Sequence, residues 1–264
     1  PQREKIKARM TQLMNFERFS TPYKEGGVYF FSRNDGLQNQ NVWFTAGSLT
    51  AEPKLLVDPN TLSPDGTVSM GAPIPDEHAR HVAYQISKSG SDWQEIRVRE
   101  VATSRELPDR IEWVKFSGIS WAKDGSGFYY SRYDAPKESE KLTKVNEFQK
   151  LYFHRLGTPQ SGDIVAFGDD AHPFRYVSGQ VSEDQRWLIV SAANQTYGNA
   201  VYLLSLTDPK AKWVTVVADT KNSHSIVDVD DVSLYIQTDK DAPTGRVVMA
   251  PLKNPQPEHW QTLI

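Results

Sequence analysis

A short motif recurs along this chain and constrains its fold more than any other feature. In each copy a small or polar residue precedes an aspartate, a tight turn follows, and a hydrophobic strand comes next. The aspartates are Asp76, Asp124, Asp184 and, in a weaker copy, Asp231. Their spacings of 48, 60 and 47 residues are close to the roughly 40–50 residues of a four-stranded propeller blade. Repetition at this period predicts an all-β fold, a β-propeller with room for about five blades.

Short runs of aromatic and β-branched residues, bounded by Gly, Pro, Asn or Asp, predict the strands of these blades. The clearest runs are residues 28–31, 42–44, 54–57, 128–130, 188–190 and 247–249. Further strands are expected later in each copy, at residues 95–101, 151–156, 201–206 and 213–217. Strands do not alternate with amphipathic helices, which argues against a parallel α/β sheet. A large β-sandwich is the alternative, but it would not repeat one Asp-turn motif at a near-constant period.

Only the start of the chain is predicted to be helical. Apolar residues follow helical spacing there, at Ile6, Met10, Leu13 and Met14. Residues 138–150 form a weak helical candidate, but their charge and polarity favour a long surface connection. The expected organisation is the end of an N-terminal helical segment over residues 1–16, followed by propeller blades over residues 17–264.

Composition excludes several classes of protein. With 38% hydrophobic and 11% aromatic residues, the chain of 264 residues can bury a core, so it is neither disordered nor fibrous. Thirty Lys and Arg against 33 Asp and Glu leave a net charge of −3, which provides no general positive field for nucleic acid or an anionic membrane. The absence of Cys removes disulfides and thiolate chemistry but does not choose between cytoplasm and periplasm.

The known motifs of catalysis and of metal or cofactor binding are absent from this sequence. It contains no Gly-x-Ser-x-Gly nucleophile turn, no His-Glu-x-x-His, no Gly-x-Gly-x-x-Gly and no Walker loop. The acidic stretches 169–170 and 228–231 lack the Gly and distal Glu of a calcium loop, and solvated turns explain them better. His78 and His81 are predicted to be polar surface residues. No catalytic residue, metal site or cofactor is therefore expected within this chain.

Several stretches are more specific than a general propeller pattern. They include Pro-Tyr-Lys-Glu-Gly-Gly-Val-Tyr-Phe at 22–30, Gly-Leu-Gln-Asn-Gln at 36–40, Gly-Ser-Asp-Trp at 90–93, Val-Lys-Phe-Ser at 114–117 and Gln-Lys-Leu-Tyr-Phe-His-Arg-Leu-Gly-Thr at 149–158. In this order and spacing they closely resemble the N-terminal half of the prolyl oligopeptidase (prolyl endopeptidase) family of serine peptidases. The resemblance covers essentially the whole chain. It is dense up to about Asp163 and rests mainly on the blade pattern beyond that residue.

The resemblance implies a parent protein of two domains. One is an α/β-hydrolase that carries a Ser, Asp and His triad, and the other is a seven-bladed propeller that covers the active site. This chain would be a fragment or a cleaved portion of that parent, with about five blades and without the triad. The parent would hydrolyse short peptides on the C-terminal side of proline, and a ring of blades over the cleft would admit only such flexible substrates. The expected partners are short proline-containing peptides and the hydrolase domain, and the segment alone is predicted to be inactive.

The resemblance also assigns residues by motif. Phe116, in Val-Lys-Phe-Ser, matches a phenylalanine that helps form the apolar pocket for the substrate residue two before proline; an ordinary core aromatic is the alternative. Asp92, in Gly-Ser-Asp-Trp, matches a cavity-facing aspartate near a hydrolase arginine, which makes it a candidate for an interdomain ion pair; a turn-forming Asp is the alternative. Tyr176 and Gln195 align near other residues of the same pocket, but the local sequence departs from the family pattern there.

Two other functions remain open on the sequence. One is a freestanding propeller that binds a protein or another ligand without catalysis. The other is a related exopeptidase or an oligopeptidase B-like enzyme, which keeps the chemistry and changes the substrate. Stretches 36–40 and 114–117 favour the prolyl oligopeptidase pattern over these relatives.

Overall fold

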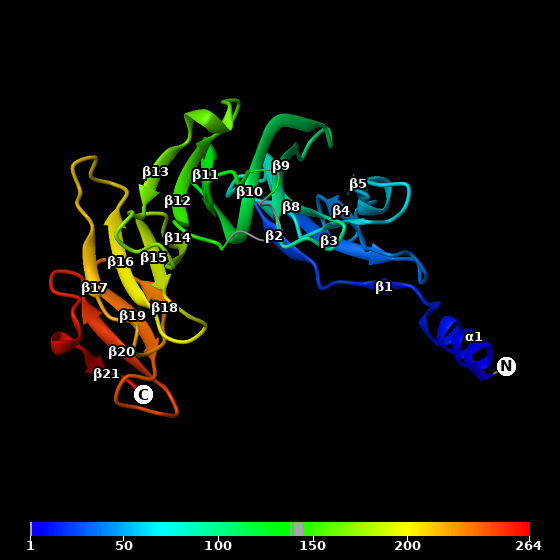
Figure 1. The fold of residues 1–264 in the computed structure, drawn as a ribbon. Helices are drawn as coiled ribbons and strands as arrows, with labels where there is room; N and C mark the ends of the chain where they lie inside the picture. Colours follow the sequence, from blue (N-terminus) through cyan, green and yellow to red (C-terminus); the bar gives the residue numbers. More distant parts are fainter. Residues whose placement is uncertain (1, 138, 140–144) are drawn as a thin grey trace. The chain divides into compact units, whose positions relative to one another are not determined.

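The structure is a computed structural model, and it describes residues 2–137, 139 and 145–264 (Figure 1). One α-helix, α1 (Gln2–Met14), lies at the start of the described residues, and short strands dominate the rest. The chain divides into two compact units, Pro1–Glu112 and Trp113–Ile264, and the boundary falls inside strand β10 (Glu106–Trp121). The strand-rich content confirms the predicted all-β class.

The first unit contains two antiparallel sheets. The strands of the first sheet are β1 (Arg18–Phe19), β2 (Tyr23–Glu25), β3 (Val28–Asn34), β4 (Val42–Ala46) and β5 (Lys54–Val57). Both β1 and β2 pair with β3, so together they act as one interrupted first strand of a β3–β4–β5 meander. A 3₁₀ turn, η1 (Pro59–Thr61), follows β5 and is capped by the side chain of Asp58.

The second sheet repeats this plan. Its strands are β6 (Val68–Met70), β7 (Ile74–Pro75), β8 (His81–Lys88), β9 (Gln94–Glu100) and the first part of β10. Strands β6 and β7 pair with β8 one after the other and again form an interrupted first strand. A core cluster takes residues from both sheets of this unit: Phe30, Leu56, Val57, Ala79, Val82 and Val101. The two sheets therefore bury apolar faces against each other, which stabilises each of them.

The second unit contains three antiparallel sheets. The first joins the second part of β10 to β11 (Gly127–Arg132), β12 (Lys150–Arg155) and β13 (Ile164–Phe167). The next sheet is β14 (Tyr176–Val181), β15 (Trp187–Ala193), β16 (Ala200–Ser205) and β17 (Val214–Val217). The last is β18 (His224–Val229), β19 (Ser233–Thr238), β20 (Arg246–Pro251) and β21 (Gln261–Thr262). Two 3₁₀ turns, η3 (Gln160–Gly162) and η4 (Pro257–His259), precede β13 and β21.

Core clusters connect successive sheets within the second unit as well. One combines Leu151 of β12 with the buried valines and leucine of β14 and β15, namely Val177, Val181, Leu188 and Val190. Gly179 allows this close approach, because a Cβ at that position would lie 2.4 Å from Leu151 Cδ2. By hydrogen bonding the described strands form four antiparallel sheets, because the long strand β10 belongs to both the β6–β9 and the β11–β13 strands. Divided at β10 they make five successive strand sets of blade type, as the repeat predicts, and not the two sheets of a sandwich.

The Asp-turn motif has a common structural basis in all four copies. The side chains of Asp76, Asp124 and Asp184 each accept a hydrogen bond from the backbone N–H two residues later, at 3.0, 2.9 and 3.0 Å. In the fourth copy the residue that does this is Asp230, at 2.8 Å from the Val232 nitrogen. The prediction of Asp231 was wrong by one residue: that side chain is exposed and pairs with Arg186. These Asx turns form locally, which explains why the motif was detectable in sequence.

The other local predictions can be compared with the structure in the same way. The helix is confirmed as α1, although none of its side chains is buried. Of the weak helical candidate 138–150, residues 138 and 140–144 lie outside the described residues, and Lys150 begins β12. His78 is exposed as predicted, but His81 is half-buried, and its Nδ1 lies 3.1 Å from the fully buried Asp76 carboxylate. The buried carboxylate needs hydrogen-bonding partners, and His81 is one of them.

Candidate functional site

A pocket in the second unit brings together three residues that the family resemblance assigned to a substrate pocket. Phe116 comes from β10, Tyr176 begins β14, and Gln195 follows β15. The pocket has a volume of about 410 Å³, and its other lining residues are Val177, Ser178, Ser191, Ala193 and Thr196. None of these side chains is charged, and the size is within the usual range of ligand pockets. The arrangement suits an uncharged, largely apolar group.

Phe116 is presented by an unusual backbone. Its φ is +53°, in the left-handed region that bulky residues rarely adopt, and the pairing of β10 with β11 shifts register between Val114 and Ile119. A bulge of this kind redirects a side chain out of the regular sheet pattern. The Phe116 side chain stays 54% exposed and meets the Tyr176 ring edge-to-face, with centroids 5.7 Å apart and planes at 72°. The alternative of an ordinary core aromatic therefore does not hold.

The loop that carries Gln195 is fastened to the last sheet of the same unit. The Tyr197 hydroxyl donates to Asp239 at 2.8 Å. The amide of Asn199 donates to the His224 carbonyl and accepts from the His224 N–H, at 2.9 and 2.8 Å. Gly198 has a φ of +76°, and a Cβ there would lie 2.1 Å from the Thr220 carbonyl oxygen, so only glycine fits. Burial lowers the pKa of the His224 side chain, so the imidazole beside these backbone contacts is neutral near pH 7.

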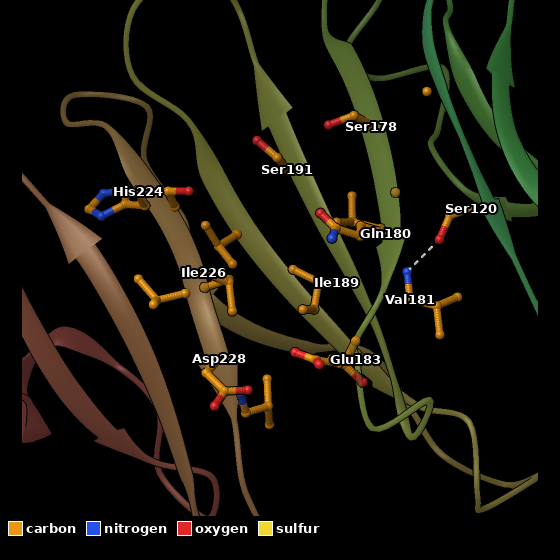
Figure 2. A pocket seen from close by; sticks show the side chains of 18 of the residues that line it. Ser120, Ser178, Gln180, Val181, Glu183, Ile189, Ser191, His224, Ile226 and Asp228 are labelled. Carbon is orange, nitrogen blue, oxygen red and sulfur yellow. Dashed lines mark hydrogen bonds between the residues drawn. The ribbon is translucent and has the colours of Figure 1, made fainter. Parts of the chain in front are cut away.

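A second, more polar pocket shares Ser178 and Ser191 with the first (Figure 2). Its volume is about 580 Å³, and Figure 2 shows Glu183 and Asp228 at one end and His224 at the other. No sequence motif predicts this pocket. The acidic stretch 228–231 is not entirely the solvated turn that was expected, because Asp228 lies within β18. The available signal was limited to β14, where the polar residues Ser178 and Gln180 lie two apart.

Asp92 lies outside the pocket that contains Phe116. It is an exposed residue of the connection between β8 and β9, in the first unit. The candidate site therefore unites Phe116, Tyr176 and Gln195, and Asp92 has to be considered separately.

Two polar clusters elsewhere have a different character. In the second unit, His154 Nδ1 lies 2.7 Å from Asp163 Oδ1, and the Tyr130 hydroxyl donates to Asp163 at 2.6 Å. Both members of the His–Asp pair are fully buried, so no substrate can reach this pair.

Within the described residues, no group of three or more His, Cys, Asp or Glu has the geometry of a metal site. Nor does any helix in that part of the chain have the length and apolar character to cross a membrane.

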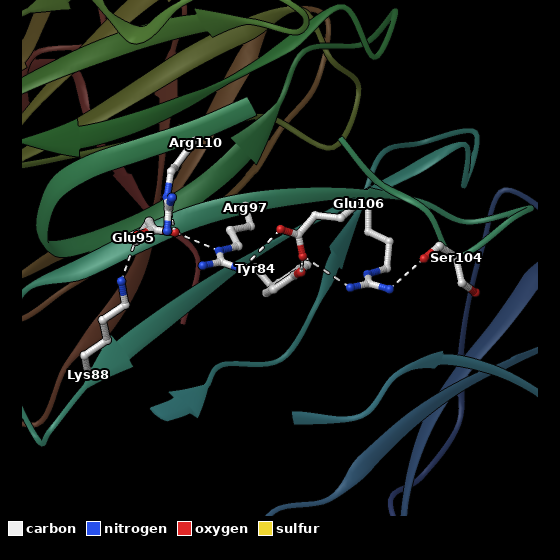
Figure 3. A network of polar contacts seen from close by, with 8 residues as sticks. Tyr84, Lys88, Glu95, Arg97, Ser104, Glu106 and Arg110 are labelled. Carbon is white, nitrogen blue, oxygen red and sulfur yellow. Dashed lines mark hydrogen bonds and ion pairs between the residues drawn. The ribbon is translucent and has the colours of Figure 1, made fainter. Parts of the chain in front are cut away.

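A charged network occupies one face of the second sheet of the first unit (Figure 3). Glu95, whose side chain is only 9% exposed, pairs with Arg97 and Arg110 at 2.7 Å and with Lys88 at 3.4 Å. Arg97 also reaches Glu106, which accepts a hydrogen bond from the buried Tyr84 hydroxyl at 2.9 Å. Burial would raise the pKa of Glu95, but the hydrogen bonds from Arg110 and Arg97 outweigh it and the pKa is lowered. Glu95 is therefore held as a carboxylate.

Comparison with known proteins gives the family. The family model for the N-terminal β-propeller domain of prolyl oligopeptidase matches residues 1–264. The chain belongs to the prolyl oligopeptidase family. Prolyl endopeptidases of Elizabethkingia meningoseptica and Elizabethkingia miricola are 39% and 40% identical to it over 264 residues, which is all of this chain.

Solved prolyl oligopeptidases have the same fold. Prolyl oligopeptidase B from Galerina marginata, bound to a 35mer hydrolysis and macrocyclization substrate, superimposes with a TM-score of 0.90 at 26% identity and covers 99% of this chain. This chain spans 37% of the length of the two Elizabethkingia enzymes and 39% of the Galerina marginata chain. It therefore corresponds to the propeller region of the prolyl oligopeptidase family.

Proposed function

We propose that this chain is the substrate-gating propeller portion of a serine peptidase that hydrolyses short peptides on the C-terminal side of proline. The parent reaction would use a Ser nucleophile, a His base and an orienting Asp from an α/β-hydrolase domain, which is the proposed partner of this propeller. Membership of the prolyl oligopeptidase family supports this proposal.

The observation that most supports the proposed peptidase function is the pocket formed by Phe116, Tyr176 and Gln195. An exposed aromatic ring on a strained backbone costs free energy, and such strain is found where function requires it. We assign this pocket to the substrate residue two positions before proline. Its aromatic, uncharged walls favour a large apolar side chain at that position over glycine.

Two further assignments belong to the same proposal. Residues 1–16 form the end of the N-terminal helical segment, and residues 17–264 form propeller blades. Asp92, exposed on the connection between β8 and β9, makes an ion pair with an arginine of the hydrolase domain. Neither assignment affects the pocket.

The test uses the complete protein and two reporter peptides, Phe-Gly-Pro-reporter and Gly-Gly-Pro-reporter. We expect both to be cleaved after proline, with a higher kcat/KM for the Phe peptide. A folded protein with exposed prolines should not be cleaved, because the blades exclude it. If the complete protein cleaves neither peptide, the proposal is overturned.

Two simpler measurements accompany this test. The purified segment 1–264 should not cleave either peptide, and cleavage by it would contradict the assignment of the triad to the hydrolase domain. The gene should encode a glycine-rich serine nucleophile turn downstream of Ile264. A stop codon there would favour the freestanding binding module.

A further inference from the structure

We propose that Gln149 is a positioning residue that sets the shape of the Phe116–Tyr176 pocket; the functional part of this inference rests on the peptidase function proposed above. Gln149 precedes β12 and does not line the pocket. It is only 2% exposed, so a substrate in the pocket does not contact it. Its influence on that substrate would act through the residues that it holds.

The Gln149 side chain joins the two aromatic walls of the pocket through their backbones. Its Nε2 donates to the Lys115 carbonyl at 2.7 Å and lies 3.5 Å from the Phe116 carbonyl oxygen. Its Oε1 accepts from the Val177 N–H at 2.8 Å, and Val177 follows Tyr176 directly. One planar amide therefore links the bulge in β10 to the start of β14, and a change in its geometry moves one wall relative to the other.

The bulge needs such a link because its backbone is strained. Trp113 and Phe116 have φ values of +61° and +53°, and left-handed conformations of this kind cost on the order of 1–3 kcal/mol each. They persist only where surrounding contacts hold them. The side chains that bind this segment across the register shift include Gln149 and Ser117, whose hydroxyl accepts from the Ser131 N–H at 2.7 Å.

Gln149 is itself held in place by its neighbour in sequence. Phe148 also has a left-handed backbone, with φ +63°, and its N–H donates to the Pro173 carbonyl at 2.6 Å. Pro173 lies shortly before β14 in the chain. The Phe148–Pro173 hydrogen bond ties the residue before Gln149 to the segment that leads into β14, and so directs the Gln149 amide between the bulge and β14. A side chain held in this way fits a positioning role better than a space-filling one.

The test measures which peptide is affected. In the complete protein, Gln149→Met keeps the approximate length of the side chain and removes both hydrogen bonds. Gln149→Glu keeps the acceptor for the Val177 N–H and loses the donor to the Lys115 carbonyl. For both variants we expect kcat/KM for the Phe-Gly-Pro peptide to fall by about tenfold through a higher KM, since small displacements of a binding wall have effects of this size. The Gly-Gly-Pro peptide, which leaves the pocket empty, should change by less than about twofold.

Gln40 offers a matched control. In the first unit its amide also makes one donated and one accepted backbone hydrogen bond, to the Val68 carbonyl at 2.7 Å and from the Met70 N–H at 2.9 Å, but both partners lie in the single strand β6. Gln40→Met and Gln40→Glu should lower stability without altering the ratio of kcat/KM between the two peptides. That ratio separates positioning from a general loss of folded protein.

The outcomes distinguish this inference from the proposed function. If the unmodified protein cleaves neither peptide, the proposed function fails. If it cleaves both and the Gln149 variants keep the unmodified ratio, or change it no more than the Gln40 variants do, the positioning role is overturned. Should Gln149→Met be insoluble, the ratio of kcat/KM is measured on Gln149→Glu, which loses only the donor to the Lys115 carbonyl.

Discussion

The charged network around Glu95 and the pocket around Phe116 show two opposite uses of a blade surface. In the network, Glu95 and Glu106 are surrounded by the cations that neutralise them, and the backbone follows the regular ladder of β8 and β9. In the pocket, two aromatic rings stay exposed, and one of them stands on a left-handed backbone at a break in strand register.

The difference separates stability from binding. A network with satisfied partners holds strands together and leaves nothing available for a ligand. Exposed rings on strained backbone lower stability and provide a surface that a ligand can cover. We therefore expect substitutions in the network to change stability without changing substrate preference, and substitutions in the pocket to change substrate preference.

The largest effect is expected from Glu95→Ala. It removes the shared partner of Arg97 and Arg110, and breaking a buried ion pair costs about 3 kcal/mol or more in free energy of unfolding. Urea denaturation of the complete protein measures this loss. Glu17→Ala is the control, because the exposed Glu17–Arg33 pair should contribute less than about 1 kcal/mol. Equal losses for the two variants would show that the network is no more stabilising than a surface pair.

The next effect is expected in the pocket. Phe116→Ala removes one aromatic wall, and kcat/KM for the Phe-Gly-Pro peptide should fall by about tenfold to a hundredfold, as hydrophobic pocket contacts typically contribute. The Gly-Gly-Pro peptide should be almost unaffected. Glu95→Ala, assayed at a temperature where it remains folded, should leave the preference between the peptides unchanged. Equal losses for both peptides in Phe116→Ala would argue against the pocket assignment.

A smaller effect tests the strain directly. Phe116→Gly and Phe116→Ala remove the same ring, but only glycine adopts a φ of +53° without strain, so the Gly variant should be more stable by about 1 kcal/mol. Tyr176 is the control, since it is not among the residues with positive φ. There the order should reverse, and Tyr176→Gly should be less stable than Tyr176→Ala. The same order at both positions would mean that Phe116 is not strained.

The smallest effect concerns pH. The pKa of Glu95 is lowered in the folded chain, so its contribution is complete above the unfolded value of about 4.3 and is lost as the pH falls through the lower folded value. Glu95→Gln mimics the protonated side chain. The difference in free energy of unfolding between the unmodified protein and this variant should shrink between about pH 6 and about pH 3. A difference that is constant over this range would show that the Glu95 charge does not stabilise the fold.

Much of the fold could be predicted because its signals are local. An Asx turn involves residues two apart, and helical spacing extends over one or two turns, so Asp76, Asp124, Asp184 and α1 were detectable. The error at Asp231 was a shift of one residue, because the turn is formed by its neighbour Asp230 in a stretch that holds three aspartates, at 228, 230 and 231.

The site was less predictable because its members are far apart in sequence. Phe116, Tyr176 and Gln195 were suggested by family resemblance, and no local pattern connects them. Gln149 was not singled out, since a buried glutamine before a strand has no sequence signature. The partners of its amide, Lys115 and Val177, lie 34 and 28 residues away.

The amino-acid sequence by itself determined the repeating sheets and the residue types available to them, because turn formation and strand alternation depend on neighbours in the chain. Only the tertiary structure decided which of those residues share a surface. Sheet packing brings the β10 bulge, the start of β14 and the end of β15 together, and one buried amide connects two of them. That connection depends on contacts between distant segments, which exist only after the sheets have packed.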